Sequence, residues 1–324
     1  MSGFLSSFTE GEGSQRKYYF MAGLPRSGST LLSSILNQNP RFHSGPSSPV
    51  LSAMHVLEQH FFNDELYHGY PKPDQAYSVV SNIINHYYED VEQEVIIDKN
   101  RAWVARIPFI QHYIGGPVKV ICPVRDIEEI LTSMLTMIKR NPYREGQGRI
   151  NFVDEQLVKL NIPISDETRC EYIAGPDGIL GQSLNAIVAG MNEGYFANIH
   201  FVEYSDLISR PQETMDAIYK FLGEETFEHS FDDIENKHRE RDIETYGLED
   251  MHYVRPELGS TSPDPRTILS PYILERCRGM DFWRQTPFTQ GVQSIPNYIE
   301  TSPNQVNVIA PDQEETEETE TQED

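Results

Sequence analysis

Short apolar runs alternate with amphipathic stretches along most of the chain. Four runs are typical of buried strands, at residues 18–22, 94–98, 118–124 and 199–204. Between and after them, apolar side chains recur at helical spacing, over 31–36, 74–90, 103–113, 127–138, 179–191 and 211–222. This alternation of strands and helices predicts an α/β fold, in which a mostly parallel central sheet is covered by helices on both faces.

Local signals refine the predicted element boundaries. Asp126 is placed to cap the helix that begins at residue 127, with Glu129 as its capping-box partner. Gly223 follows the last periodic residue of a helix and is expected to end it. Residues 141–168 are polar and poorly periodic, so we expect an irregular excursion there.

Charge is distributed unevenly in this chain of 324 residues. Its 26 Lys and Arg face 50 Asp and Glu, a formal net charge of −24. A surface this acidic repels nucleic acid and anionic membranes, so an anionic ligand needs a local binding site. Residues 311–324 hold eight carboxylates and no Lys or Arg, which predicts a disordered, solvating tail. We therefore expect a flexible start at 1–16, one domain at 17–290 and a disordered acidic tail at 291–324.

Cysteine usage and the start of the chain indicate the compartment. The three cysteines form no C-x-x-C pair, so neither a disulfide framework nor a zinc site is predicted. The first residues lack a basic start followed by a long apolar run, as a signal peptide or membrane anchor would have. A cytoplasmic protein without nucleic-acid or membrane partners is expected, with its oligomeric state open.

The stretch from Gly23 to Thr30 has the spacing of a phosphate-binding loop, G-x-x-x-x-G-K-[ST], with Ser29 in place of the lysine. This stretch follows a predicted strand and precedes a predicted helix. That order predicts a P-loop NTPase-like fold, a three-layer sandwich with a mostly parallel central sheet. Such a loop binds anions through backbone N–H groups and a helix N-terminus, neither of which needs the lysine. Without that lysine a triphosphate is disfavoured, while Arg26 supplies a cation within the loop.

The loop and the segment "VICPVRDIEEILTSML" together resemble the sulfotransferases that use 3′-phosphoadenosine 5′-phosphosulfate (PAPS), in particular their bacterial and tyrosylprotein branch. The resemblance implies that the loop residues bind the 5′-phosphosulfate end, namely Arg26, Ser27, Gly28, Ser29 and Thr30. It assigns Arg125 and Ser133 to the 3′-phosphate, which a guanidinium and a hydroxyl can share.

Three further segments match the same family in the same chain order. "VEYSDLISRPQETMDAIYKFLG" places Tyr204 near the nucleotide. "IIDKN" places Lys99 near the sulfuryl group, where a cation would balance charge on the bridging oxygen as the S–O bond breaks. "HYVRPELG" makes Arg255 a candidate for closing over the nucleotide.

The family's catalytic base has no counterpart in the sequence. The cytosolic branch has a histidine where this chain has Arg101, and the tyrosylprotein branch has a glutamate shortly after a glycine, where Gly45 here precedes proline and serines. General-base catalysis needs a group within hydrogen-bond reach of the acceptor. The candidates are His43, His55, Glu58, His60 and Asp98.

The resemblance implies an enzyme that moves a sulfuryl group in line from PAPS to an unidentified acceptor hydroxyl or amine, with Arg26 and Lys99 as catalytic residues and no metal. Two alternatives stay open. A P-loop kinase of a nucleotide or small molecule would use Asp98 to hold Mg²⁺, because an acid ends the apolar strand there. A non-catalytic nucleotide-binding relic would also explain the missing base.

Overall fold

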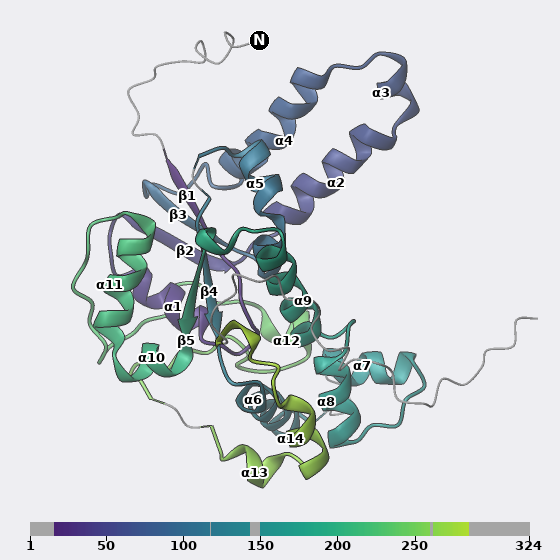
Figure 1. Cartoon of the computed structure of the whole chain (residues 1–324), viewed down its shortest axis with the longest axis vertical. Coiled ribbons are helices and arrows are strands. Elements are labelled where there is room, and N and C mark those ends of the chain that lie inside the picture. Colours follow the sequence, from purple (N-terminus) through teal and green to yellow (C-terminus); the bar gives the residue numbers. More distant parts are fainter. Residues whose placement is uncertain (1–15, 117, 143–149, 260–261, 285–324) are drawn as a thin grey trace, which may run out of the picture.

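A parallel five-stranded sheet forms the centre of the computed structural model, which describes residues 16–116, 118–142, 150–259 and 262–284 (Figure 1). The predicted flexible start up to residue 15, and the acidic tail, lie outside these residues. The strands of the described part run in the spatial order β2-β3-β1-β4-β5, and every pairing is parallel. Their bounds are β1 (Lys17–Met21), β2 (Phe42–Ser47), β3 (Val95–Lys99), β4 (Val120–Val124) and β5 (Ile199–Glu203).

Four of the strands were predicted, and the missing one is β2. Its sequence, "FHSGPS", combines Gly45 and Pro46 with small polar residues that are rare in strands. β2 lies at the edge of the sheet, and its register with β3 shifts between Ser44 and Ser47. Proline and glycine are tolerated at such an irregular edge, which is why period-two alternation is absent here.

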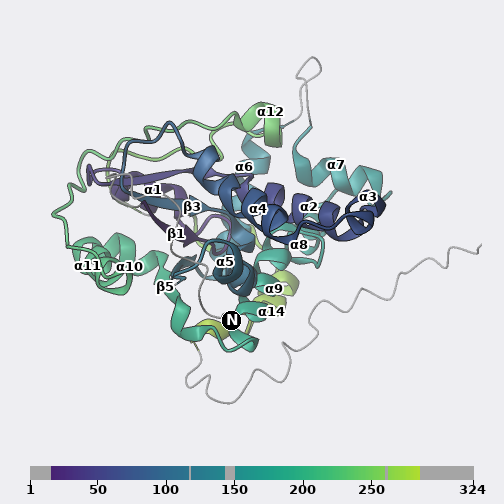
Figure 2. The ribbon, with the colours of Figure 1, turned by 90° about the horizontal axis from the view of Figure 1, so that it is seen from above.

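Helices cover both faces of the sheet, as predicted (Figures 1 and 2). Successive β1 side chains enter two different cores: Tyr19 and Met21 pack with α1 and α11, whereas Phe20 packs with α2, α4, α5, α6 and α9. The α2–α4 segment projects away from the sheet in both views. These helices are α1 (Ser29–Leu36), α2 (Val50–Asn63), α3 (Glu65–Gly69), α4 (Pro73–Tyr87), α5 (Ile107–Tyr113), α6 (Ile127–Arg140), α9 (Ile179–Asn192), α10 (Tyr204–Ser209) and α11 (Pro211–Leu222).

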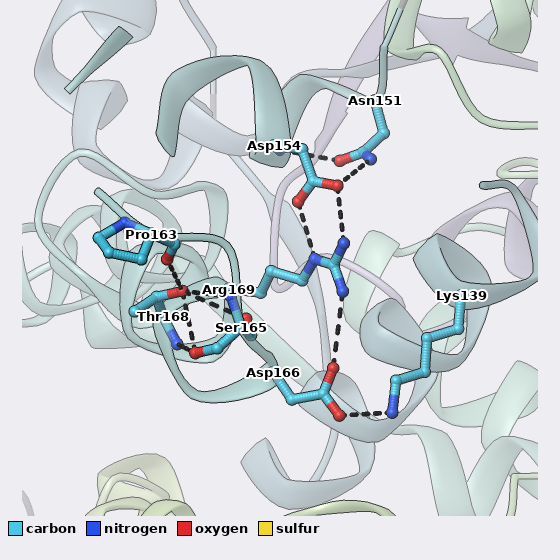
Figure 3. Close-up of polar contacts among 8 residues, drawn as sticks. All are labelled: Lys139, Asn151, Asp154, Pro163, Ser165, Asp166, Thr168 and Arg169. Atoms are coloured by element: carbon cyan, nitrogen blue, oxygen red, sulfur yellow. Dashed lines mark hydrogen bonds and ion pairs between the residues drawn. The ribbon is translucent and has the colours of Figure 1, made fainter. Parts of the chain in front are cut away.

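The polar excursion at 141–168 contains helix α7 (Phe152–Lys159) and the start of helix α8 (Asp166–Ala174), so the expectation of irregular structure was wrong there. Polar contacts hold this pair in place (Figure 3). The guanidinium of Arg169 donates from Nε and Nη2 to the two carboxylate oxygens of Asp154, at 2.7 and 2.8 Å. Asp166 links Arg169 to Lys139 of α6, and Ser165 caps α8. Charge pairs hold α7 and α8 in place, and their apolar stripes are weak. The spacing of apolar residues in the sequence therefore did not indicate these two helices.

Helix ends agree with the sequence signals in part. α11 ends at Gly223, which has the left-handed backbone that favours glycine (φ 74°). α6 begins where predicted, but the capping box does not form, because Asp126 accepts from Arg284 while Glu129 accepts from Arg125. Shorter elements complete the described chain, namely the 3₁₀ turns Arg101–Arg106, Phe196–Asn198 and Phe282–Arg284 and the helices α12 (Asp242–Tyr246), α13 (Pro265–Ile268) and α14 (Pro271–Cys277).

Two further features bear on the sequence predictions. The three cysteines, Cys122, Cys170 and Cys277, are buried and unpaired. Among the described helices, none combines the length and the apolar character needed to span a bilayer.

Candidate active site

A cavity of about 490 Å³ lies where the loops after β1 and β4 meet. From β1 the chain continues to β2 on one side of the sheet, and from β4 it continues to β5 on the other. Ligands of parallel α/β sheets bind at such a switch point, beyond the carboxyl ends of the strands. The start of α1, one face of α6 and residues from 249–259 and 262–263 provide the walls.

The phosphate-loop motif forms the floor of the cavity. Gly28 precedes α1 in a left-handed conformation (φ 87°), and no side chain caps the helix, so its first N–H groups stay available to an anion. A Cβ atom on Gly28 would lie 2.7 Å from the ring of Tyr204. Ser29 and Thr30 line the cavity, but the buried hydroxyl of Ser27 donates to the Leu24 carbonyl at 2.6 Å and serves the loop itself.

Arg26 and Arg125 lie side by side at the cavity. Arg125 donates to the backbone oxygen of Arg26 at 3.2 Å, and its guanidinium carbon is 4.3 Å from the centre of the Tyr204 ring. The Nε of Arg26 donates to the Ser133 hydroxyl at 3.2 Å, and its Nη1 donates to the carbonyl of Met251. Four predicted site residues, from the loops after β1 and β4 and from α6 and α10, therefore meet in one place.

Positive charge is concentrated at this cavity despite the acidic composition of the chain. Its lining has five arginines, Arg26, Arg101, Arg125, Arg140 and Arg255, and three carboxylates, Glu249, Asp250 and Glu257. Burial and the neighbouring charge of Arg125 lower the pKa of Arg26. Cations held so close together at a cost indicate an anionic ligand.

Sequence reasoning missed two polar residues of α6 that line the cavity, Thr136 and Arg140. They follow Ser133 by three and seven residues, which places all three on one helix face. The hydroxyl of Thr136 is buried and has no hydrogen-bond partner among the described residues. The helical spacing from Ser133 is the signal that could have identified both.

Lys99 lies beside the loop but does not line the cavity. It ends β3 in register with Met21, the last residue of β1, and its Nζ is 3.8 Å from Oε1 of Glu240. Burial lowers the pKa of Lys99 to about 8, although Glu240 opposes this shift. Arg101, two residues later, lines the cavity, and burial lowers its pKa as well.

None of the five candidate bases lines the cavity. Asp98 is fully buried, and its carboxylate accepts from Ser48 (2.5 Å), Tyr88 (2.7 Å) and Trp103 (2.6 Å). Burial raises its pKa, and these donors oppose the shift. It thus anchors the core around β3. The remaining candidates lie elsewhere, His43 on β2 and His55, Glu58 and His60 on α2.

Residues 240–252 hold a second group of charges that the sequence analysis did not identify. Glu240, Asp242 and His252 present ligand atoms within 4.8 Å of one another, a spacing that a metal ion could use. However, the ring Nδ1 of His252 is already 2.6 Å from Asp242, and the cation Lys99 faces Glu240. The negative charge of Glu240 and Asp242 is therefore partly compensated within the protein.

Comparisons with known proteins point to a family. A family model described as a sulfotransferase domain matches residues 16–242. The sulfotransferase domain from the curacin biosynthetic pathway is 14% identical, with a TM-score of 0.49, and the alignment covers 85% of this chain and 100% of that one. The sulfotransferase domain of the Synechococcus PCC 7002 olefin synthase is 15% identical over 87% and 100%, with a TM-score of 0.46.

A retinol dehydratase solved in complex with androsterone and the inactive cofactor PAP is 12% identical, over 86% of this chain and 83% of its own, with a TM-score of 0.43. A comparison with curated proteins finds no significant match.

Proposed function

This chain belongs to the sulfotransferase domain family, and from that premise we propose that it transfers a sulfuryl group from PAPS to an acceptor hydroxyl or amine. The observation that carries the proposal is the meeting of Arg26, Arg125, Ser133 and Tyr204 around one cavity. These residues come from four separate segments, so a turn or a surface pair alone does not explain their convergence.

The cavity has the properties that an adenosine with phosphates at both ends requires. The open N-terminus of α1 and Arg26 suit the 5′-phosphosulfate. Arg125 and Ser133 suit the 3′-phosphate, and the unpartnered Thr136 hydroxyl offers a further donor on the same side. The volume of the cavity lies within the range of small-molecule binding sites.

The residues divide the chemistry between them. Arg26 and the loop N–H groups hold the phosphosulfate in line with the acceptor. Lys99, next to the loop in the sheet, supports the negative charge that builds up on the bridging oxygen when the S–O bond breaks. This charge stabilisation does not require a metal ion.

The P-loop kinase alternative fits less well. The carboxylate that would hold Mg²⁺, that of Asp98, is buried and already accepts from three side chains. Ser29 stands where a triphosphate site has its lysine.

Ligand binding by the purified full-length chain tests the proposal. We expect tight binding of 3′-phosphoadenosine 5′-phosphate (PAP) with or without Mg²⁺, and weak binding of ATP. Transfer from labelled PAPS to members of a panel of alcohols, phenols and amines should follow. A preference for ATP that depends on Mg²⁺, improved by Ser29→Lys, would refute sulfuryl transfer and favour a kinase. PAP binding without turnover on any acceptor would favour the relic.

A further inference from the structure

A hydrogen-bonded histidine and carboxylate lie at the edge of the cavity. Asp242, the first residue of α12, accepts from the ring Nδ1 of His252 at 2.6 Å and from the backbone N–H of the same residue at 2.9 Å. The two bonds fix the imidazole and place its proton on Nδ1, because Asp242 can only accept when ionised. The other nitrogen, Nε2, then carries a free lone pair and has no hydrogen-bond partner among the described residues.

The position of His252 relates it to the sulfuryl end of the cavity. The carbonyl of the preceding residue, Met251, accepts from Arg26, so the segment is attached to the phosphate loop. Glu240 lies between His252 and Lys99, with its Oε2 3.5 Å from Nδ1 and its Oε1 3.8 Å from Nζ. His252 itself lines the cavity. It is therefore adjacent to the two residues assigned to the reacting phosphosulfate.

We propose that His252 is the general base that deprotonates the acceptor and that Asp242 is the residue that positions it, an inference that rests on the proposed function. Arg101, at the position where the cytosolic branch has its base, cannot accept a proton at neutral pH. In this chain the base comes instead from the loop after α12, which contains His252.

The step balances without any other reactant. A lone pair of the acceptor oxygen or nitrogen forms the new bond to sulfur while the bond from sulfur to the bridging oxygen breaks. The bridging oxygen keeps that electron pair and leaves as part of PAP. The acceptor proton passes to Nε2 of His252, the imidazolium is stabilised by Asp242, and the proton then goes to solvent.

The surroundings keep the imidazole available as a base. Burial lowers the pKa of His252, the carboxylates of Asp242 and Glu240 oppose this shift, and the charge of Lys99 adds to it. The ring of Tyr246 packs against it at 5.5 Å. Glu240 is a weaker candidate for the base, because its carboxylate already serves as counter-ion to Lys99.

Variants of His252 and Asp242, with a matched control, test the assignment, with PAP affinity and single-turnover transfer from PAPS as paired readouts. His252→Gln should lower the transfer rate by about 10²- to 10⁴-fold and leave PAP affinity within about twofold. Asp242→Asn should lower the rate less and keep PAP binding. The control is His86→Gln, since His86 also has Nδ1 near a carboxylate (Glu89, 3.8 Å) but is exposed on α4; it should behave as the unmodified chain.

The pH profile separates a base from a merely structural residue. The rate of the unmodified enzyme should rise with pH through the pKa of His252, and this limb should disappear in His252→Gln. If Glu240→Gln abolishes transfer while His252→Gln retains both transfer and the acidic limb, His252 is not the base. If the unmodified enzyme binds PAP but transfers to no acceptor, the proposed function fails, whereas loss of the base alone leaves that function standing.

Discussion

Two groups of charged side chains in this protein are arranged in opposite ways. In the network between α6, α7 and α8, opposite charges match: Arg169 pairs with Asp154, and Asp166 pairs with Lys139 (Figure 3). The hydrogen bond with Asp154 raises the pKa of Arg169. Burial raises the pKa of Asp154, but hydrogen bonds from Arg169 and Asn151 outweigh it and leave that pKa below its usual value.

At the cavity, cations crowd together instead. Burial lowers the pKa of Arg26 and Arg101, which line the cavity, and of Lys99 beside it, and their partners only partly offset this shift. The α6–α8 network pairs its own charges and so stabilises the scaffold, whereas the cavity lining has five arginines against three carboxylates, an excess of positive charge that favours an anion. An excess of charge of one sign, rather than the presence of charge itself, distinguishes the binding site.

The largest effect on activity is expected from removing Arg26, the cation of the phosphate-binding loop. Arg26→Ala should reduce kcat/KM for transfer from PAPS by roughly 10³-fold, because a preorganised donor to the developing charge is lost. Steady-state kinetics measures this. Arg210→Ala, which removes the exposed pair with Asp206, is the control and should leave kcat/KM unchanged. An Arg26 variant with near-normal kcat/KM would contradict the assignment.

Breaking the charge pairs between α6, α7 and α8 should lower the stability of the fold without changing the binding of PAP. Arg169→Met leaves the carboxylate of Asp154, only 8% exposed, without its charged partner. We expect a loss of roughly 2 kcal/mol in the free energy of unfolding, with an unchanged denaturant slope. Urea titration measures the loss, and PAP affinity should stay the same. A parallel fall in PAP affinity would mean that the two regions are coupled.

The lowered pKa of Lys99 predicts how activity depends on pH. Its charge is present below about pH 8 and is lost as the pH rises. The value of kcat/KM should therefore fall by about tenfold per pH unit above that point. In Lys99→Arg the remaining activity should be flat up to pH 9, because arginine stays protonated. The same alkaline limb in both proteins would assign it to another group.

The smallest effect is expected from Thr136 and Thr132, two threonines of α6 whose buried hydroxyls have no hydrogen-bond partner in the described part of the chain. Thr136 lines the cavity and Thr132 does not, so the two form a matched pair. Thr136→Val should weaken PAP binding by about fivefold, the value of one hydrogen bond. Thr132→Val should not change it. Neither change should lower the melting temperature, and equal PAP affinity in both variants would remove Thr136 from the site.

Much of the fold and part of the site follow from local sequence. Buried strands such as β1 and β4 are continuous apolar runs, and parallel pairing brings their carboxyl ends together. For that reason Arg26 and Arg125, which are 99 positions apart, could be assigned to one cavity.

The remainder depends on contacts that local sequence does not encode. β2 lacks alternation because it pairs through an irregular edge at Gly45 and Pro46. The group of Glu240, Asp242 and His252 forms by packing of α12 and its flanking loops, without a periodic pattern. Sequence reasoning therefore searched for the base on β2, β3 and α2, where the structure has no cavity-lining candidate.

The central claim is that the cavity recognises an adenosine phosphorylated at both its 3′ and 5′ positions. The most direct test compares the affinities for PAP and for adenosine 5′-phosphate, which lacks only the 3′-phosphate, in the unmodified protein and in Arg125→Ala. We predict a preference for PAP of about 10- to 100-fold, as expected for a charged hydrogen bond, that nearly disappears in the variant. Equal affinities in the unmodified protein, or a preference that survives the loss of Arg125, would contradict it.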